Sequence, residues 1–218
     1  MTAGTEHSDP APGSSEYWDH RYATIGDTEV SWFQDTPQIS LDLIGRVVDH
    51  GASVVDVGGG ASRLVDRLLD AGYHDVTVVD LSQQALNAAH GRLGDSPVTW
   101  VVTDIRDWQP DRTFDVWHDR AAYHFLIDPD DQQRYWQLVR DSVPRGGHVI
   151  VATFAEDGPE KCSGLEVMRH DEGSLQRELG GGFELLETRR ETHLTPWQTV
   201  QEFVYARFQR RVTARPGS

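Results

Sequence analysis

Cysteine is nearly absent from this sequence, and long apolar runs are missing. The single cysteine, Cys162, excludes an internal disulfide, and without a second cysteine or a His-Glu-x-x-His motif we predict no metal site. The longest apolar runs, such as Val54–Val57 and His148–Ala152, are too short to cross a bilayer. No signal-peptide pattern opens the chain. These absences predict a cytoplasmic protein without a membrane partner.

Basic residues are also scarce. The chain has 20 Lys and Arg against 35 Asp and Glu, which gives a formal net charge of −15. Such a surface repels phosphate backbones, so we predict that nucleic acid is not a partner. The length of 218 residues, with 38% hydrophobic residues, is typical of one soluble domain with a buried core.

The chain is predicted to have three regions. Residues 1–14 are rich in Gly, Pro, Ser and Thr and predict a disordered tail. Residues 15–51 predict a helical lid and entry helix, because aromatic residues follow Ser15 and apolar residues recur at helical spacing from Ile39 to Val48. Residues 52–212 predict the main domain.

Short apolar strands alternate with helices from Ser53 onward. The predicted strands cover 53–57, 75–80, 98–103, 114–118 and 147–154, and the predicted helices cover 61–71, 82–93 and 129–142. This alternation is typical of a parallel sheet covered on both faces. A helix over 171–179 and two long strands, 183–193 and 198–209, follow. We therefore predict an α/β, Rossmann-like fold with a seven-stranded mixed sheet and a C-terminal antiparallel hairpin.

A glycine-rich loop lies directly between the first strand and the next helix. Gly58 and Gly60 allow a tight turn and a close approach of the backbone to a ligand. The nicotinamide fingerprint requires Gly or Ala where Arg63 stands. Asp56, just before the glycines, opposes a pyrophosphate and suits a cationic amino group. A purely structural role for Asp56 is the alternative.

Acidic residues end the next two strands. Asp80 is placed to accept hydrogen bonds from both hydroxyls of a ribose. Asp104 is placed to accept from an adenine amino group, with Ile105 packed on the ring. Either acid taken singly is explained equally well as a loop carboxylate or a helix cap. Together with Asp56 they predict one ligand site, because ligands of open α/β sheets bind along this edge.

These motifs and the closing hairpin resemble class I S-adenosylmethionine (SAM) dependent methyltransferases, over about residues 39–208. The resemblance implies that SAM is the cofactor. The chain departs from that family at Ser62, where a third glycine is common. The residues implied to hold SAM in this part of the chain are Gly58, Gly60, Asp80, Leu81, Asp104 and Ile105.

A narrower resemblance involves the segment Tyr17–Tyr22. Followed by Trp32, it is similar to the entry segment of a group that includes eukaryotic elongation-factor lysine methyltransferases. That similarity implies that Trp18, Tyr22, Trp32 and Arg120 enclose SAM, and aromatic faces do attract cations. The alternative is that the aromatic residues pack a short helix on the core. The whole chain also resembles small bacterial methyltransferase-domain proteins, through the loop Asp157–Leu165.

The reactive end of the site is predicted after the fourth strand. His118 and His124 are the candidate bases, with His124 preferred, because histidine titrates near neutrality. We expect Asp119 to orient a neighbour or the amino group of SAM. The alternative for His124 is a core residue, and we expect Cys162 to be an ordinary loop thiol.

The sequence predicts methyl transfer to a small-molecule acceptor, with a thiol or hydroxyl favoured. Protein lysine methylation is the main alternative, motivated by the entry segment. A SAM-binding regulator without turnover and a nucleotide-dependent oxidoreductase are further alternatives. The Asn/Asp-Pro-Pro-aromatic motif of DNA and protein-glutamine amino methyltransferases is replaced by His118–Ala121, which disfavours that class.

Overall fold

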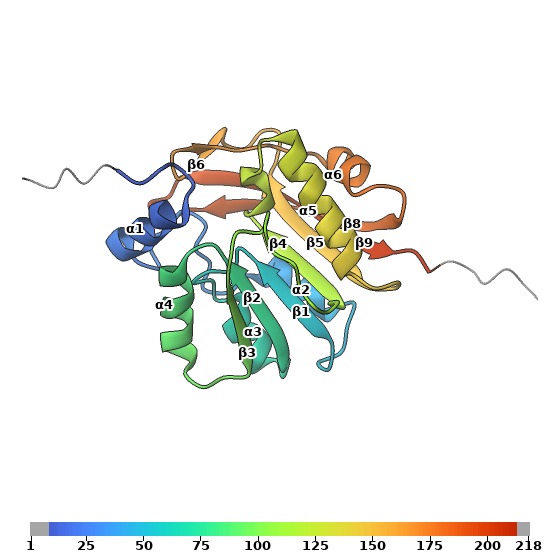
Figure 1. Cartoon of the computed structure of the whole chain (residues 1–218). Coiled ribbons are helices and arrows are strands. Elements are labelled where there is room, and N and C mark those ends of the chain that lie inside the picture. Colours follow the sequence, from blue (N-terminus) through green and yellow to red (C-terminus); the bar gives the residue numbers. More distant parts are fainter. Residues whose placement is uncertain (1–8, 213–218) are drawn as a thin grey trace, which may run out of the picture.

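A seven-stranded mixed sheet runs through the centre of the computed structural model, which describes residues 9–212 (Figure 1). The strand order is β3-β2-β1-β4-β5-β9-β8, and a separate two-stranded sheet pairs β6 with β7. The bounds are β1 Ser53–Val57, β2 Asp75–Asp80, β3 Val98–Val102, β4 Val116–Arg120, β5 His148–Phe154, β6 Lys161–Cys162, β7 Leu165–Glu166, β8 Phe183–Leu194 and β9 Val200–Arg210.

The first five strands are parallel, and β9 lies antiparallel between β5 and β8. This arrangement confirms the predicted mixed sheet with a C-terminal hairpin.

Helices cover both faces of the sheet. Their bounds are α1 Ser15–Ile25, α2 Gln38–Gly45, α3 Leu64–Asp70, α4 Gln83–Leu93, α5 Pro129–Ser142 and α6 Glu172–Leu179, with a 3-10 turn at Tyr123–Phe125. The core on one face includes residues of α2, α3 and α4, and the core on the other includes residues of α5 and α6. Strand β4 serves both cores, because Val116 and Trp117 point to opposite sides.

Local sequence explains where several helices begin. The Ser82 side chain accepts a hydrogen bond from the backbone N–H of Ala85 and so caps α4. Asp128 caps α5 in the same way, and Pro129 occupies its first turn, where the missing N–H costs nothing. These caps place the predicted starts of α4 and α5 within one residue of the observed ones.

Some predicted boundaries are wrong. The fourth strand begins at Val116 and ends at Arg120 instead of covering 114–118, because the N–H of Phe114 donates to Ser142 and the pairing with β1 starts at Val116. The helix predicted over 61–71 begins at Leu64, since the Ser62 hydroxyl accepts from the N–H of Leu64 and ends the preceding turn. Similarly, α2 ends at Gly45 rather than Gly51.

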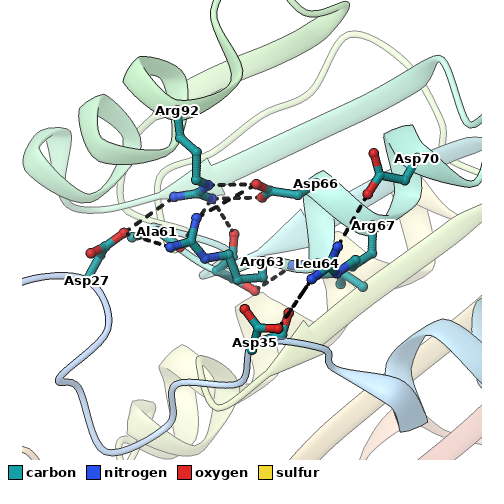
Figure 2. A network of polar contacts seen from close by, with 10 residues as sticks. Asp27, Asp35, Ala61, Arg63, Leu64, Asp66, Arg67, Asp70 and Arg92 are labelled. Atoms are coloured by element: carbon teal, nitrogen blue, oxygen red, sulfur yellow. Dashed lines mark hydrogen bonds and ion pairs between the residues drawn. The ribbon is translucent and has the colours of Figure 1, made fainter.

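A network of polar contacts joins the end of the glycine loop to helices α3 and α4 (Figure 2). Arg92 of α4 donates to the carbonyl of Ser62 at 2.9 Å and to Asp66 of α3 at 2.6 Å. Arg63 and Arg92 both pair with Asp27, at 3.7 and 3.5 Å. The network therefore ties the segment after α1 to the two helices that flank the loop.

No helix within residues 9–212 is long and apolar enough to span a membrane. Of the predicted tail over 1–14, residues 1–8 lie outside the described residues. The boundaries proposed for the lid (15–51) and the main domain (52–212) stay predictions.

Candidate functional site

A cavity of about 680 Å³ lies at the carboxyl ends of the parallel strands. Its volume suits a ligand of drug size, and its position is where open α/β sheets bind ligands. The predicted cofactor residues that line it are Trp18, Tyr22, Trp32, Gly58, Asp80, Leu81, Asp104, Ile105 and Arg120.

The glycine loop forms the floor of this cavity. Gly58 has φ +66°, and a Cβ there would lie 2.5 Å from the Cβ of Ala122, so only glycine fits. Gly60 does not line the cavity, but a Cβ at this residue would lie 2.9 Å from Oδ2 of Asp80 and 3.0 Å from the hydroxyl of Tyr22. Gly60 thus leaves room for two side chains of the cavity wall.

Asp80 lies at the end of β2, as the sequence predicts. Its Oδ1 accepts a hydrogen bond of 2.8 Å from the N–H of Ser82. Burial raises the pKa of Asp80 to about 7, and the nearby carboxylates of Asp56 and Asp19 add to the rise. Burial also raises the pKa of Tyr22, so its phenol stays protonated and can donate.

Asp104 also faces the cavity, but it has a partner that sequence reasoning missed. Arg106 donates from Nε to both carboxylate oxygens of Asp104, at 2.9 and 3.0 Å, and reaches Asp131 of α5 at 3.4 Å. The hydrogen bonds from Arg106 hold the pKa of Asp104 below its ordinary value. A basic residue two positions after the acid is the signal that could have suggested this pair.

The aromatic residues of the entry segment form another part of the cavity wall. Trp18 packs edge-to-face against Trp32 and Phe125, with ring centroids 5.9 and 5.2 Å apart. Helix α1 is held on α4 by Asp19, whose carboxylate accepts from the Ser82 hydroxyl at 2.6 Å. In Figure 1, α1 accordingly lies beside the start of α4.

Arg120, at the end of β4, contacts four other residues. Its Nε donates to the hydroxyl of Tyr205 at 2.8 Å, and its Nη1 donates to the carbonyl of Trp32 at 3.0 Å. Its guanidinium lies 4.4 Å from the ring centre of Phe203, and Glu191 lies 3.4 Å away. A cationic side chain is therefore held rigidly at the boundary between the cavity and the C-terminal hairpin.

A roof that was not predicted lies over the cavity. It consists of Pro12–Ser14 and the hairpin residues Gly164–Glu166, which line the cavity on the same side. The Tyr17 hydroxyl donates to the carbonyl of Ser163, and a Cβ at Gly13 would touch Leu165 at 3.7 Å. Cys162 lies in β6 of this hairpin and is buried rather than exposed in a loop.

Two predicted residues, Asp56 and His118, lie outside the lining of the large cavity. Asp56 accepts a hydrogen bond of 2.7 Å from Nδ1 of His118, and Nε2 of His118 lies 2.8 Å from the hydroxyl of Ser40. All three side chains are buried, and none of them lines the large cavity. The expectation that His118 acts as a base is not met by this geometry.

Asp119 and His124 are buried as well. Asp119 accepts from the Tyr135 hydroxyl at 2.7 Å and from the N–H groups of Ala122 and Tyr123, and its predicted orienting role stays a prediction. Burial raises its pKa to about 6. His124 packs against Phe154 and lies outside the cavity lining, and burial lowers its pKa to about 3. A ring that does not take up a proton near neutrality does not fit the predicted general base.

One protein-family model matches part of this chain. A model described as "Methyltransferase domain" matches residues 54–147, which include the glycine loop, both cavity acids and β4. Residues 54–147 are therefore similar to a methyltransferase domain.

The curated relatives match only parts of this chain. The chain is 28% identical to a malonyl-[acyl-carrier protein] O-methyltransferase of Anoxybacillus flavithermus, over 52% of this chain and 43% of that protein. It is 23% identical to the eEF1A lysine and N-terminal methyltransferase of Mus musculus, over 59% of this chain and 19% of that protein. The chain thus spans less than half the length of these two relatives. The second match agrees with the resemblance of the entry segment.

Solved structures share the fold over most of the chain. One matching structure is described as "Conversion of a Disulfide Bond into a Thioacetal Group during Echinomycin Biosynthesis". It matches with a TM-score of 0.72 and 18% identity, and the match covers 92% of this chain and 94% of the other. The N-methyltransferase NodS of Bradyrhizobium japonicum, in complex with S-adenosylhomocysteine, matches with a TM-score of 0.63 and 16% identity, covering 81% and 89%. The chain therefore shares its fold with methyltransferases, among them NodS, which holds S-adenosylhomocysteine.

Proposed function

We propose that this chain transfers the methyl group of SAM to a small-molecule nucleophile, a thiol in preference to a hydroxyl. One observation carries the proposal. A single cavity is lined by Asp80 and Asp104 at the ends of the strands and by the aromatic residues Trp18 and Trp32. No histidine lines this cavity within the described part of the chain.

The lining residues fit the parts of SAM one by one. Asp80 would accept from the ribose hydroxyls, and Asp104 would accept from the adenine amino group beside Ile105. Trp18 and Trp32 would cover the sulfonium, whose positive charge an aromatic face attracts. When bound, SAM supplies a methyl group that is already activated for in-line displacement. The chain therefore has to align the acceptor, exclude water and leave the acceptor's lone pair available.

The lack of a histidine among the lining residues of the cavity, within the described part of the chain, favours a thiol. His118 and His124 lie behind the cavity wall, and Asp131 is paired with Arg106. A thiol has a pKa of about 8.5 and a phenol one of about 10, so a thiol forms its reactive anion near neutrality with much less help. Phe125 and Leu165 add apolar surface to the cavity, which suits sulfur, a soft and weakly hydrated atom.

The roof favours a small acceptor over a folded protein. The contact between Tyr17 and Ser163 joins two segments far apart in the chain across the cavity, so a protein surface would have to displace it. Protein lysine methylation stays the second candidate, because the chain is similar to an eEF1A lysine methyltransferase. A SAM-binding regulator without turnover is the third.

Incubation with SAM labelled in its methyl group separates these candidates. The purified chain would be mixed with a panel of thiols and phenols, and separately with a protein-containing cell extract. We expect label in the small-molecule fraction, higher with thiols, and none when Asp80→Ala replaces the wild type. Label confined to a protein band would favour the lysine acceptor, and SAM binding without transfer to any acceptor would favour the regulator. A thermal shift with NAD(P)H but none with SAM would indicate an oxidoreductase.

A further inference from the structure

A buried chain of hydrogen bonds lies behind the glycine loop. It runs from the hydroxyl of Ser40 on α2 to Nε2 of His118 on β4, and from Nδ1 of His118 to Oδ1 of Asp56 on β1. The two distances are 2.8 and 2.7 Å, and the three residues are exposed by 0%, 2% and 3%. Asp56 and His118 are direct neighbours because β1 and β4 are parallel with these residues in register.

The chemistry of these groups gives the chain a direction. A carboxylate only accepts hydrogen bonds, so Nδ1 of His118 carries the proton that it shares with Asp56. In the neutral ring Nε2 is then the acceptor, and the Ser40 hydroxyl donates to it. Asp56 therefore fixes the tautomer of His118, Ser40 holds the orientation of its ring, and His118 holds one oxygen of Asp56.

The other oxygen of Asp56 faces the glycine loop. A Cβ at Gly59 would lie 2.5 Å from Oδ2, so glycine at this residue makes room for the carboxylate. Asp56, Gly58 and Gly59 line a small pocket of about 30 Å³, enough for a water molecule or a group of similar size. Tyr22, Trp32, Gly58 and Arg120 line both this pocket and the large cavity.

We propose that Ser40 and His118 are positioning residues that aim Asp56 at the amino group of the cofactor's methionine end. The inference rests on the proposed SAM-binding function. The small pocket adjoins the cavity at Gly58, and its acidic oxygen suits an ammonium group, while the nearby Arg120 suits the carboxylate of the same amino acid. Ser40 and His118 also line the small pocket, and we expect them to act on the cofactor through Asp56.

Two ligands isolate this effect. S-adenosylhomocysteine carries the amino acid end, and 5′-methylthioadenosine lacks it but keeps the adenosine and a neutral sulfur. Titration calorimetry with both ligands should show that Ser40→Ala weakens S-adenosylhomocysteine by about tenfold, the effect of misplacing one charged hydrogen bond, and leaves methylthioadenosine unchanged. Ser40→Thr keeps a hydroxyl and should restore the affinity, and His118→Leu should weaken S-adenosylhomocysteine more than Ser40→Ala does.

The matched control is Asp104→Asn, which should weaken both ligands, because both contain adenine. Equal weakening of the two ligands by Ser40→Ala, or no change in either, would overturn the inference. If His118→Leu fails to fold, as judged by circular dichroism, Ser40→Ala and Ser40→Thr decide the outcome. Wild-type protein that binds neither ligand would instead refute the proposed function, and the inference with it.

Discussion

Replacing Asp80 by asparagine should stabilise the ligand-free protein and weaken its binding of adenosine ligands. Asparagine has nearly the same shape, and its oxygen can still accept the hydrogen bond that the N–H of Ser82 donates at 2.8 Å. The change therefore removes mainly the negative charge. That charge is unfavourable in the cavity, because burial raises the pKa of Asp80 to about 7 and the carboxylates of Asp56 and Asp19 repel it.

The size of the effect follows from the pKa. A rise from 3.8 to about 7 corresponds to about 4 kcal/mol against the ionised form, at about 1.4 kcal/mol per tenfold change. Water reaches the half-buried side chain from the cavity and screens the charge, so we expect a gain of roughly 1–2 kcal/mol. The native state holds the proton more tightly than the unfolded chain, so the wild type loses this stability as the pH rises from 3.8 through about 7.

Urea unfolding of both proteins measures this difference. The asparagine variant should be the more stable at about pH 8, and the difference should vanish near pH 4, where both side chains are neutral. Affinity for S-adenosylhomocysteine should fall by about tenfold to a hundredfold, because a charged acceptor for the ribose is lost. Asp104→Asn is the control with the opposite sign, since Arg106 lowers the pKa of Asp104 and its charge is stabilising. A variant at Asp80 that is less stable than the wild type at about pH 8 would refute the reasoning.

Three further predictions test other parts of the site. Gly58→Ala should lower both the melting temperature and the affinity for S-adenosylhomocysteine, because its Cβ would meet Ala122 at 2.5 Å; unchanged values in thermal unfolding and calorimetry would contradict the loop geometry. Arg106→Ala should destabilise the protein near neutral pH, with the loss fading on acidification as Asp104 becomes protonated, and urea unfolding at several pH values checks this. His124→Leu should raise stability, because both ring nitrogens are buried without a partner in the described chain, and should preserve the methyl-transfer rate. A rate loss of about a hundredfold or more would restore His124 as the base.

The order of the strands along the chain and the positions of Asp80 and Asp104 in the site could be predicted from the sequence, because they depend on local features. Apolar runs of strand length, caps such as Ser82 and glycine breaks act within a few residues of each other. A residue that ends a parallel strand reaches the ligand edge of the sheet whatever the packing, which is why Asp80 and Asp104 line the cavity as predicted.

The roles predicted for His118, Asp119 and His124 depended on where the fourth strand begins and ends. The sequence alone does not determine how that strand is aligned with its neighbours in the sheet. A shift of two residues in β4 moved Asp119 and Arg120 into the strand. In the folded chain His118 is buried and hydrogen-bonds to Asp56, and His124 is buried against Phe154. Neither histidine lines the cavity proposed to hold the methyl acceptor. The pattern of residue types alone could not separate a base in the cavity from a histidine of the core.

By itself the sequence determined the α/β alternation, the glycine turn and the acids at the strand ends, because these follow from hydrogen bonds and periodicity between near neighbours. Only the tertiary structure decided which polar side chains meet. Tyr17 contacts Ser163 to roof the cavity, and Ser40 reaches His118 behind it, across long stretches of chain. Such contacts are set by how the helices and strands pack on the sheet, and no local pattern encodes them.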